Sequence, residues 1–300
     1  MVVSEDYAHL HPLTRPFAEE DAATRIRRIR TDRWIGYARA EAALAALDDL
    51  LSFPKRTRMP NLLVVGPTNN GKTMIVEKFR RSHPAIEAID AHDGVASLPV
   101  IKVQMPPGPD EGRLFGSILE ALGMPYPPRQ RIAIRQDVAM RVLRGAGVRM
   151  LVIDELHNLL SGTAQQQRRL LNLLRWLGNE LQVPLVGVGT VEALRAIRSD
   201  DQLANRFEPF PLPLWTDGEP YRRLLGTLEA ALPLRRPSGM ADGPLAAKIL
   251  TASEGVLGEI IATVTRSAVL AVRSGAERIT AGQIDESGFI RPSERRRVAI

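Results

Sequence analysis

The chain has 300 residues, a formal net charge of +6, 44% hydrophobic residues and no cysteine. This hydrophobic share is enough for a packed core, and without cysteine the sequence can form neither disulfides nor thiolate metal sites. No apolar run approaches the length of a membrane span, and the first residues lack the basic start and apolar stretch of a secretory signal. We therefore expect a cytoplasmic protein without a membrane partner, and the basic balance mildly favours a polyanionic one.

Residues 1–58 form a helical lead-in. A first helical stretch begins near Phe17, and an Ala-rich helix runs from about Trp34 to Leu51, before Pro54. A basic helix face can bind nucleic acid, but it is more often simply solvated, and we favour the solvated interpretation. The arginines of the first stretch are Arg25, Arg27, Arg28, Arg30 and Arg33.

A short apolar strand, Leu62–Val65, leads into the pattern Gly-x-x-x-x-Gly-Lys-Thr and then into a helical pattern. This order is typical of the phosphate-binding loop of nucleoside triphosphatases, and a chance glycine-rich turn is the less favoured alternative. The two glycines let backbone N–H groups point at phosphate oxygens. Lys72 can reach the β- and γ-phosphates, and the Thr73 hydroxyl can bind Mg²⁺. The candidate ATP-binding residues are Gly66, Pro67, Thr68, Asn69, Asn70, Gly71, Lys72, Thr73 and Met74.

A second apolar run ends in two carboxylates, Asp154 and Glu155. Ligands of open α/β sheets bind at the carboxyl ends of the strands, so we expect Asp154 beside the phosphate loop. There it would hold Mg²⁺, through water. Glu155 could accept a proton from the water that attacks the γ-phosphate. The alternative is a strand end followed by two solvated acids.

Strand and helix patterns alternate over residues 59–215, which predicts an α/β fold with a mostly parallel five-stranded sheet covered on both faces. The predicted strands are Leu62–Val65, Leu98–Gln104, Val148–Ile153, Val183–Val188 and Phe210–Leu214. Residues 216–287 carry only helical patterns and predict a small all-helical lid. The last residues, 288–300, are a basic tail that we expect to be disordered.

The order of these motifs resembles that of the AAA+ ATPases, and several segments resemble the TniB family more closely. TniB proteins are the ATPase subunits of transposition systems and are relatives of TnsC and, more distantly, of MuB. The segments that carry the resemblance are Leu151–Leu160, Leu171–Glu180, Val186–Thr190 and Asp201–Pro209. The resemblance covers roughly residues 55–290.

The resemblance implies roles for further residues. Residues Gly66 to Thr73 match the Walker A loop, and Asp154 with Glu155 matches Walker B. Thr190 matches sensor 1, although it could be a strand-end threonine bonded to backbone. Arg206 falls where these ATPases place an arginine finger that acts on the neighbouring subunit's nucleotide; Arg198 is a rival, and an ordinary surface arginine is the alternative.

One departure from the family pattern concerns the lid arginine known as sensor 2. The matching segment, Gly255–Glu259, contains no arginine, and Arg266 lies two helical turns further on. This favours slow, switch-like ATP hydrolysis over a fast motor.

The resemblance also implies partners: double-stranded DNA, further copies of the chain in a ring or helical filament, a TniA-like DDE transposase and an accessory TniQ-like targeting protein. No sequence-reading DNA motif is found, so we expect contacts to phosphates alone. Solvated surface is again the alternative for each candidate. The candidate DNA contacts are Lys102, Arg113, Arg129, Arg131 and Arg135.

Three other functions stay open. A replication initiator or helicase loader would carry a DNA-binding domain after the lid, for which 287–300 is short. A metabolic P-loop kinase would act as a monomer without DNA. A scaffold that binds ATP without hydrolysis is compatible with the missing sensor 2 arginine. The histidines have no metal-ligand spacing, and we interpret His157, two residues after Glu155, as structural although it could reach the site.

Overall fold

The computed structural model of the protein describes residues 7–86 and 97–295. The chain divides into two compact units. The helical unit contains Met1–Ala38, Asn69–Gly71 and Leu214–Ile300, and the sheet unit contains Arg39–Thr68 and Lys72–Pro213. The expected lead-in of residues 1–58 is therefore divided between the two units, and the tip of the phosphate loop groups with the helical one.

The sheet unit is built on five parallel strands in the order β2-β3-β4-β1-β5. This confirms the predicted sheet. The last strand begins at Phe207, earlier than the predicted Phe210. The strands are β1 (Asn61–Val65), β2 (Val100–Gln104), β3 (Met150–Asp154), β4 (Leu185–Gly189) and β5 (Phe207–Pro211).

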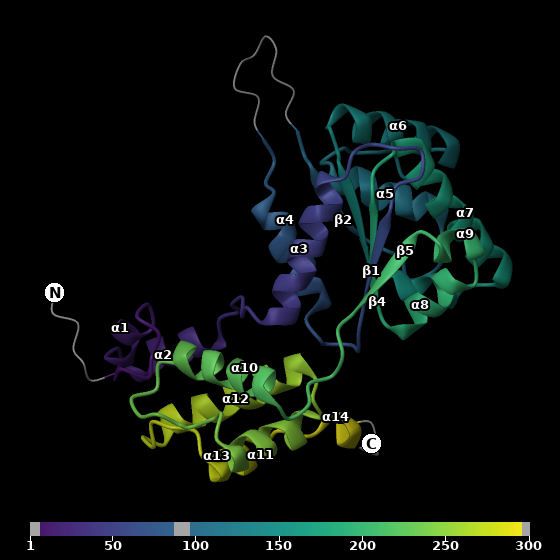
Figure 1. The fold of residues 1–300 in the computed structure, drawn as a ribbon. Coiled ribbons are helices and arrows are strands. Elements are labelled where there is room, and N and C mark those ends of the chain that lie inside the picture. The colour runs from purple at the N-terminus through teal and green to yellow at the C-terminus, as the bar shows by residue number, and fades with distance from the viewer. Residues whose placement is uncertain (1–6, 87–96, 296–300) are drawn as a thin grey trace. The chain divides into compact units, whose positions relative to one another are not determined.

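Helices cover the sheet. Every residue of β1, β3 and β4 is buried, as expected for parallel strands with both faces covered. In Figure 1, α3 and α4 lie on one side of the sheet and α7, α8 and α9 on the other. The helical segments are α3 (Ala38–Ser52), α4 (Lys72–Ser82), α5 (Glu111–Ala121), α6 (Ile132–Gly145), the 3₁₀ helix η2 (Leu156–Ser161), α7 (Ala164–Leu181), α8 (Val191–Arg198) and α9 (Asp201–Ala204).

Local side chains fix where these helices begin. Asp110 accepts a hydrogen bond from the backbone N–H of Arg113 at 2.8 Å and so caps α5. Thr163 and Gln166 form a reciprocal capping box at the start of α7. The strand order places β4 between β1 and β3. The segments that follow β1, β3 and β4 therefore emerge beside one another at the carboxyl edge of the sheet.

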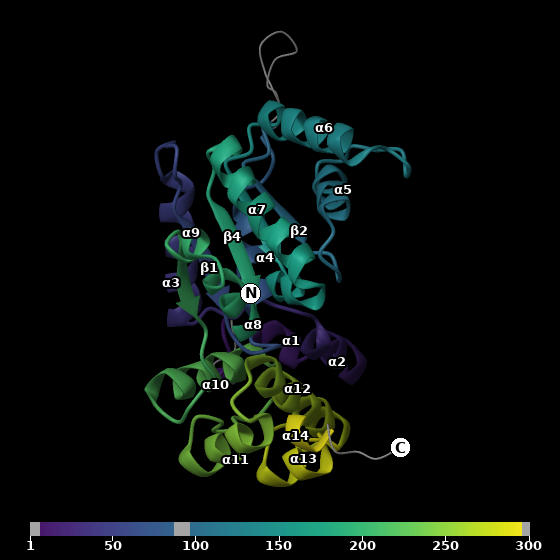
Figure 2. The ribbon, with the colours of Figure 1, turned by 90° about the vertical axis from the view of Figure 1, so that its right-hand side faces the viewer.

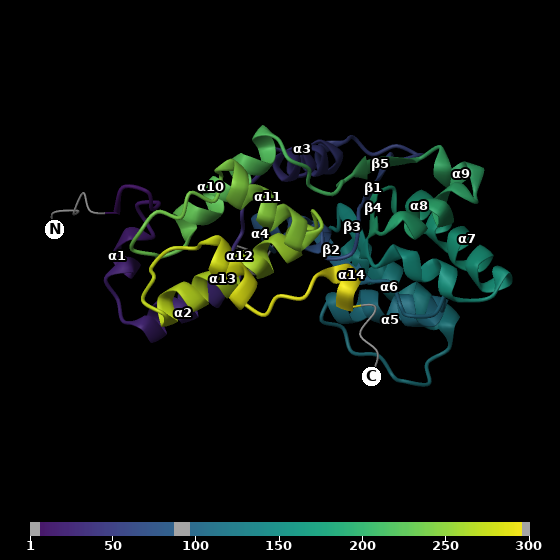
Figure 3. The ribbon, with the colours of Figure 1, turned by 90° about the horizontal axis from the view of Figure 1, so that it is seen from below.

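The helical unit has its own apolar core, which includes Tyr221, Leu225, Ile260, Val264 and Ala268. Helix α2 packs against α12, as Figures 2 and 3 show. The helices of this unit are α1 (Arg15–Ala18), α2 (Ala22–Arg30), α10 (Glu219–Ala231), α11 (Gly243–Ser253), α12 (Leu257–Arg273), α13 (Ala281–Glu286) and α14 (Pro292–Arg295).

The basic first helix is only partly the solvated face that the sequence suggests. Arg25 is 2% exposed. Its guanidinium pairs with the carboxylate of Glu277 and donates to the carbonyl oxygen of Pro233 at 3.0 Å. A buried arginine must be paired and hydrogen-bonded in this way. Arg25 therefore joins α2 to the segments that follow α10 and α12.

In the described part of the expected basic tail, α14 forms and Arg295 pairs with Glu259 of α12. Residues 296–300 lie outside the described residues. Within the described ranges, no single helix is long and apolar enough to cross a membrane; α11 and α12 pass that test only together, across a bend of 117°.

Candidate functional site

The phosphate loop has the backbone that its glycines are expected to allow. Gly71 has a φ of +82°, and Asn69 has a φ of +60°. At Gly66 a Cβ atom would lie 2.6 Å from the carbonyl oxygen of Leu212, so a side chain there would collide with backbone. Gly71 and Gly66 are thus required for two different reasons, a left-handed backbone at Gly71 and a close approach of backbone at Gly66.

Lys72 lies at the start of α4 with its ammonium folded over the loop. It is 8% exposed, and its Nζ donates to the carbonyl oxygens of Gly66 at 2.9 Å and Pro67 at 2.6 Å. Burial lowers the pKa of Lys72, and the carboxylates of Glu155 and Asp154 oppose that shift. The cation is thus held above the backbone that would cradle phosphates.

Thr73 and Asp154 come together as the Mg²⁺ prediction requires. The Thr73 hydroxyl donates to Oδ2 of Asp154 at 2.9 Å, and Asp154 is 4% exposed. A hydroxyl and a carboxylate are oxygen ligands of the kind that Mg²⁺ takes, completed by water and phosphate oxygens. The residues present therefore fit this ion. The described residues contain no separate group of three or more His, Asp or Glu side chains that could hold a metal.

Lys102 has a different place from the one expected of a DNA contact. Its Nζ lies 3.2 Å from Oδ2 of Asp154, and its side chain is 21% exposed. β2 and β3 are neighbours, and Lys102 is paired in register with Val152. Lys102 therefore balances the charge of the buried carboxylate, and its ammonium is engaged there instead of being free for a DNA phosphate.

Glu155 has left-handed backbone, with φ +54°. Its Oε2 lies 3.1 Å from Nε2 of His157, and Nδ1 of His157 is buried without a hydrogen-bond partner. Strained backbone of this kind persists only where the surroundings hold it, and it concentrates at functional sites. His157 thus contacts the candidate catalytic carboxylate, which the sequence left as the less favoured alternative to a structural role. Its spacing of two residues from Glu155 was the only sequence signal for this contact.

Thr190 follows β4, between the segments that carry the two Walker motifs. Its hydroxyl donates to Glu192, and this hydrogen bond is the main cause that lowers the pKa of the Glu192 carboxyl. The alternative for Thr190 was a bond to backbone, whereas the structure gives it a carboxylate partner on α8.

Arg206 lies at the opposite edge of the sheet. It immediately precedes β5, and its carbonyl oxygen accepts a hydrogen bond from the N–H of Asn61 at the start of β1. Its guanidinium donates to Oδ1 of Asn179 at 2.7 Å. Arg206 is therefore remote from the phosphate loop of its own chain, as a residue acting on another subunit must be.

The tip of the phosphate loop makes contacts that local sequence patterns did not indicate. The side-chain oxygen of Asn70 accepts from the N–H of Leu257 at 3.1 Å, and the carbonyl oxygen of Asn69 accepts from the N–H of Gly258 at 2.9 Å. These N–H groups belong to the first turn of α12, which has no partners within the helix. The two asparagines therefore cap a helix far away in the sequence.

Glu259 completes this arrangement. Its Oε1 accepts from Nδ2 of Asn69 at 3.1 Å, and its carboxylate also pairs with Arg295 of α14. Glu259 is 8% exposed. The segment that lacks a sensor 2 arginine thus presents a carboxylate to the loop tip, and Arg295 pairs with that carboxylate.

The remaining DNA candidates separate by exposure. Arg135 is buried; its guanidinium donates to the carbonyl oxygen of Gly112 at 2.8 Å and lies over the Tyr126 ring. Arg135 also donates to the carbonyl oxygen of Pro128, so we assign it to the structure of the loop between α5 and α6. Arg113, Arg129 and Arg131 are exposed and remain candidates.

Solved structures with a similar fold include proteins solved with DNA or with nucleotides. The ORC1 protein of Aeropyrum pernix in complex with DNA matches with a TM-score of 0.61 and 19% identity, over 87% of this chain and 68% of that one. The Cdc6p protein of Pyrobaculum aerophilum matches with 0.61 and 17%, over 86% and 69%. The ORC2 protein of Aeropyrum pernix, in ADPNP and ADP complexes, matches with 0.59 and 15%, over 91% and 72%.

The parallel sheet, the loop with Lys72 and Thr73, and the carboxylates that follow β3 define a P-loop protein of the AAA+ class. The model of the family described as bacterial TniB protein matches residues 25–217. The chain belongs to the TniB family, as its motifs predicted. A search of curated proteins finds no match.

Proposed function

We propose that this protein is an ATP-hydrolysing regulator of DNA transposition that assembles with copies of itself on duplex DNA. It would present this target to a TniA-like DDE transposase, together with a TniQ-like targeting protein, in the bacterial cytoplasm. The observation that carries the proposal is the Thr73–Asp154 contact of 2.9 Å beside the phosphate loop, in a chain that belongs to the TniB family.

In the hydrolysis of ATP to ADP and phosphate, a few side chains would each have a separate role. Lys72 would contact the β- and γ-phosphates, and the Thr73 hydroxyl and Asp154 would hold Mg²⁺. When bound, this ion neutralises charge on the phosphate oxygens. Glu155 takes a proton from the attacking water. The Thr190 hydroxyl orients that water or the γ-phosphate.

Two contacts support slow, switch-like turnover. The Glu155 carboxylate is engaged by His157, and the Thr190 hydroxyl is engaged by Glu192. Both groups must give up or rearrange these partners before they act on water. In addition, the segment Gly255–Glu259 contains no sensor 2 arginine. These features favour slow turnover over a fast motor.

Assembly and DNA binding rest on arginines away from the phosphate loop. Arg206 acts on the nucleotide of a neighbouring copy, because the sheet separates it from its own loop. Arg113, Arg129 and Arg131 contact phosphates of duplex DNA without reading bases. The ORC1 neighbour was solved with DNA and the ORC2 neighbour with nucleotides, which is compatible with both activities on this fold.

A replication-initiator or helicase-loader ATPase is the alternative, and the structural neighbours do not decide in its favour. Their identities of 15–19% concern the fold alone. The family match covers the motifs themselves, from residue 25 to residue 217. We therefore favour transposition.

Electron microscopy with duplex DNA tests the proposal directly. With a slowly hydrolysed ATP analogue we expect rings or filaments on DNA, and without nucleotide we expect few or none. The variant Lys72→Ala, which loses the cation that binds the phosphates, should give none under either condition. A wild-type chain that stays monomeric and ignores DNA with every nucleotide would refute the proposal.

A further inference from the structure

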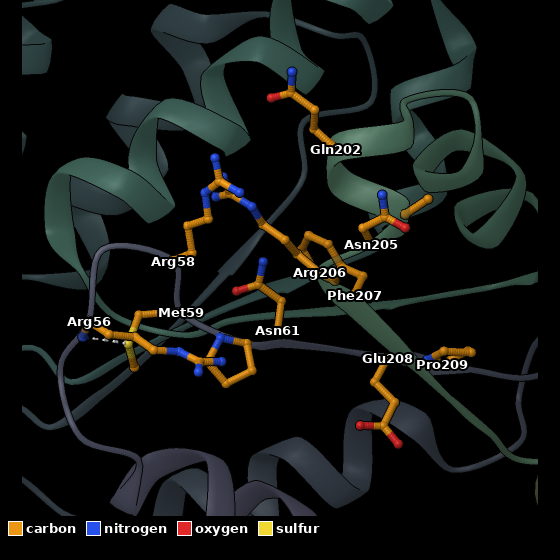
Figure 4. A pocket seen from close by; sticks show the side chains of 12 residues that line it. Arg56, Arg58, Met59, Asn61, Gln202, Asn205, Arg206, Phe207, Glu208 and Pro209 are labelled. Carbon is orange, nitrogen blue, oxygen red and sulfur yellow. Dashed lines mark hydrogen bonds between the residues drawn. The ribbon is translucent and has the colours of Figure 1, made fainter.

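A hollow of about 830 Å³ opens in the sheet unit where β1 and β5 begin (Figure 4). Its lining residues include Arg56, Arg58 and Arg206 and the amide-bearing Gln202 and Asn205. Glu208 lies at the edge of the hollow as an acidic lining residue. The lining is therefore rich in hydrogen-bond donors and carries more positive than negative charge.

Two of these arginines converge. Arg58 comes from the segment before β1, and Arg206 comes from the residue before β5, and Figure 4 shows their side chains pointing toward one another. Burial lowers the pKa of Arg206, and the positive charges of Arg58 and Arg175 lower it further. Two cations held this close repel each other, so an anion placed between them would stabilise the arrangement.

Asp200, the acidic residue that precedes α9, already has partners. Asp200 lies 3.6 Å from the guanidinium of Arg175 and caps α9 through the N–H of Leu203 at 3.0 Å. Arg206 donates one hydrogen bond to Asn179. Other donors of its guanidinium are available, since an arginine side chain carries five N–H donors. The hollow can therefore receive an external anion without breaking these contacts.

The anion cannot be the nucleotide held by the same chain. Asn61 begins β1 at the hollow, whereas Gly66 follows the other end of this five-residue strand. At about 3.3 Å per residue, these two ends lie roughly 16 Å apart. The anion must therefore come from another molecule.

We propose that this hollow receives the terminal phosphates of the nucleotide bound by a neighbouring copy, and that Arg58 contacts them together with Arg206. This inference rests on the proposed function, because it requires assembly of several copies. Converging guanidinium forks suit a compact, highly charged anion, which they can bind bidentately. A DNA backbone would instead require cations spaced along a stripe. Arg58 is thus a second residue that acts across the subunit interface.

Mixed assemblies test this inference. The variant Arg58→Ala keeps a complete Walker site but loses the second arginine, and Glu155→Gln keeps both arginines but loses the catalytic carboxylate. Each alone should hydrolyse ATP slowly, and losing one charged contact should reduce the turnover of Arg58→Ala by about 10- to 100-fold. In the mixture, sites of Arg58→Ala that face the arginines of Glu155→Gln copies should regain turnover. The control Arg169→Ala removes an exposed arginine of α7 outside the hollow and should turn over like wild type.

Several outcomes separate the claims. Wild-type turnover by Arg58→Ala, or a mixture that does not recover, would overturn the inference while leaving the proposed function intact. Loss of DNA binding by Arg58→Ala with normal turnover would assign the hollow to DNA phosphates and also overturn it. A wild-type chain that does not assemble with nucleotide would overturn the proposed function, and this inference with it.

Discussion

Replacing Gly258 by alanine tests the contact between α12 and the tip of the phosphate loop. A Cβ atom at this position would lie 2.1 Å from Oδ1 and 2.4 Å from Cγ of Asn69. Real Cβ atoms do not approach other atoms this closely, so the Asn69 side chain must rotate away. It would then lose the hydrogen bond of 3.1 Å that its Nδ2 donates to Glu259.

The size of the effect follows from two opposing terms. A hydrogen bond to a charged group contributes about 1.5–3 kcal/mol, and its loss leaves the carboxylate with Arg295 as its remaining partner. Alanine in a helix gains up to about 1 kcal/mol over glycine. With the full offset the net loss is about 0.5–2 kcal/mol, which corresponds to roughly a 2- to 30-fold change in an equilibrium constant.

The matched control is Gly226→Ala in α10, where a Cβ atom would meet nothing within 4 Å. That variant should gain stability, whereas Gly258→Ala should lose it and bind ATP about tenfold more weakly. Both quantities are measurable, by chemical unfolding and by titration with a fluorescent ATP analogue. If Gly258→Ala matches Gly226→Ala in both, the loop tip does not depend on α12 and the reasoning fails.

Three further predictions concern catalysis, DNA and pH. Glu155→Gln should bind ATP normally, hydrolyse it at least about 100-fold more slowly and remain on DNA longer in a release assay; unchanged turnover would remove Glu155 from its role. The double variant Arg129→Glu, Arg131→Glu should weaken DNA binding and make its dependence on salt less steep, and an unaltered salt slope would move the DNA surface elsewhere. The guanidinium groups of Arg80 and Arg81 hold the pKa of the Glu77 carboxyl at about 2, below its ordinary value of 4.5. Its stabilising contribution is therefore complete above pH 4.5 and is lost as the pH falls toward 2, so Glu77→Gln should be less stable than wild type at neutral pH, by up to about 1 kcal/mol, but not near pH 2. A difference that does not change with pH would contradict this assignment.

The sequence by itself determined the features that depend on neighbours along the chain. Four residues between Gly66 and Gly71 define a loop whose turn and donors are local. Apolar runs alternating with amphipathic helices specify a covered parallel sheet, because the strands must bury both faces. The acids that follow β3 belong at the carboxyl edge for the same topological reason. These predictions needed no knowledge of distant contacts.

Only the tertiary structure decided which side chains meet across long separations. Asn69 and Glu259 are 190 positions apart, and nothing in either segment indicates the other. The arginines show best what the sequence does not indicate about burial. Arg25 and Arg135 are buried in hydrogen-bonded pockets, whereas Arg58 and Arg206 meet at an open hollow. In the sequence all four are equally basic, because burial and partners are properties of the packed chain and not of residue type.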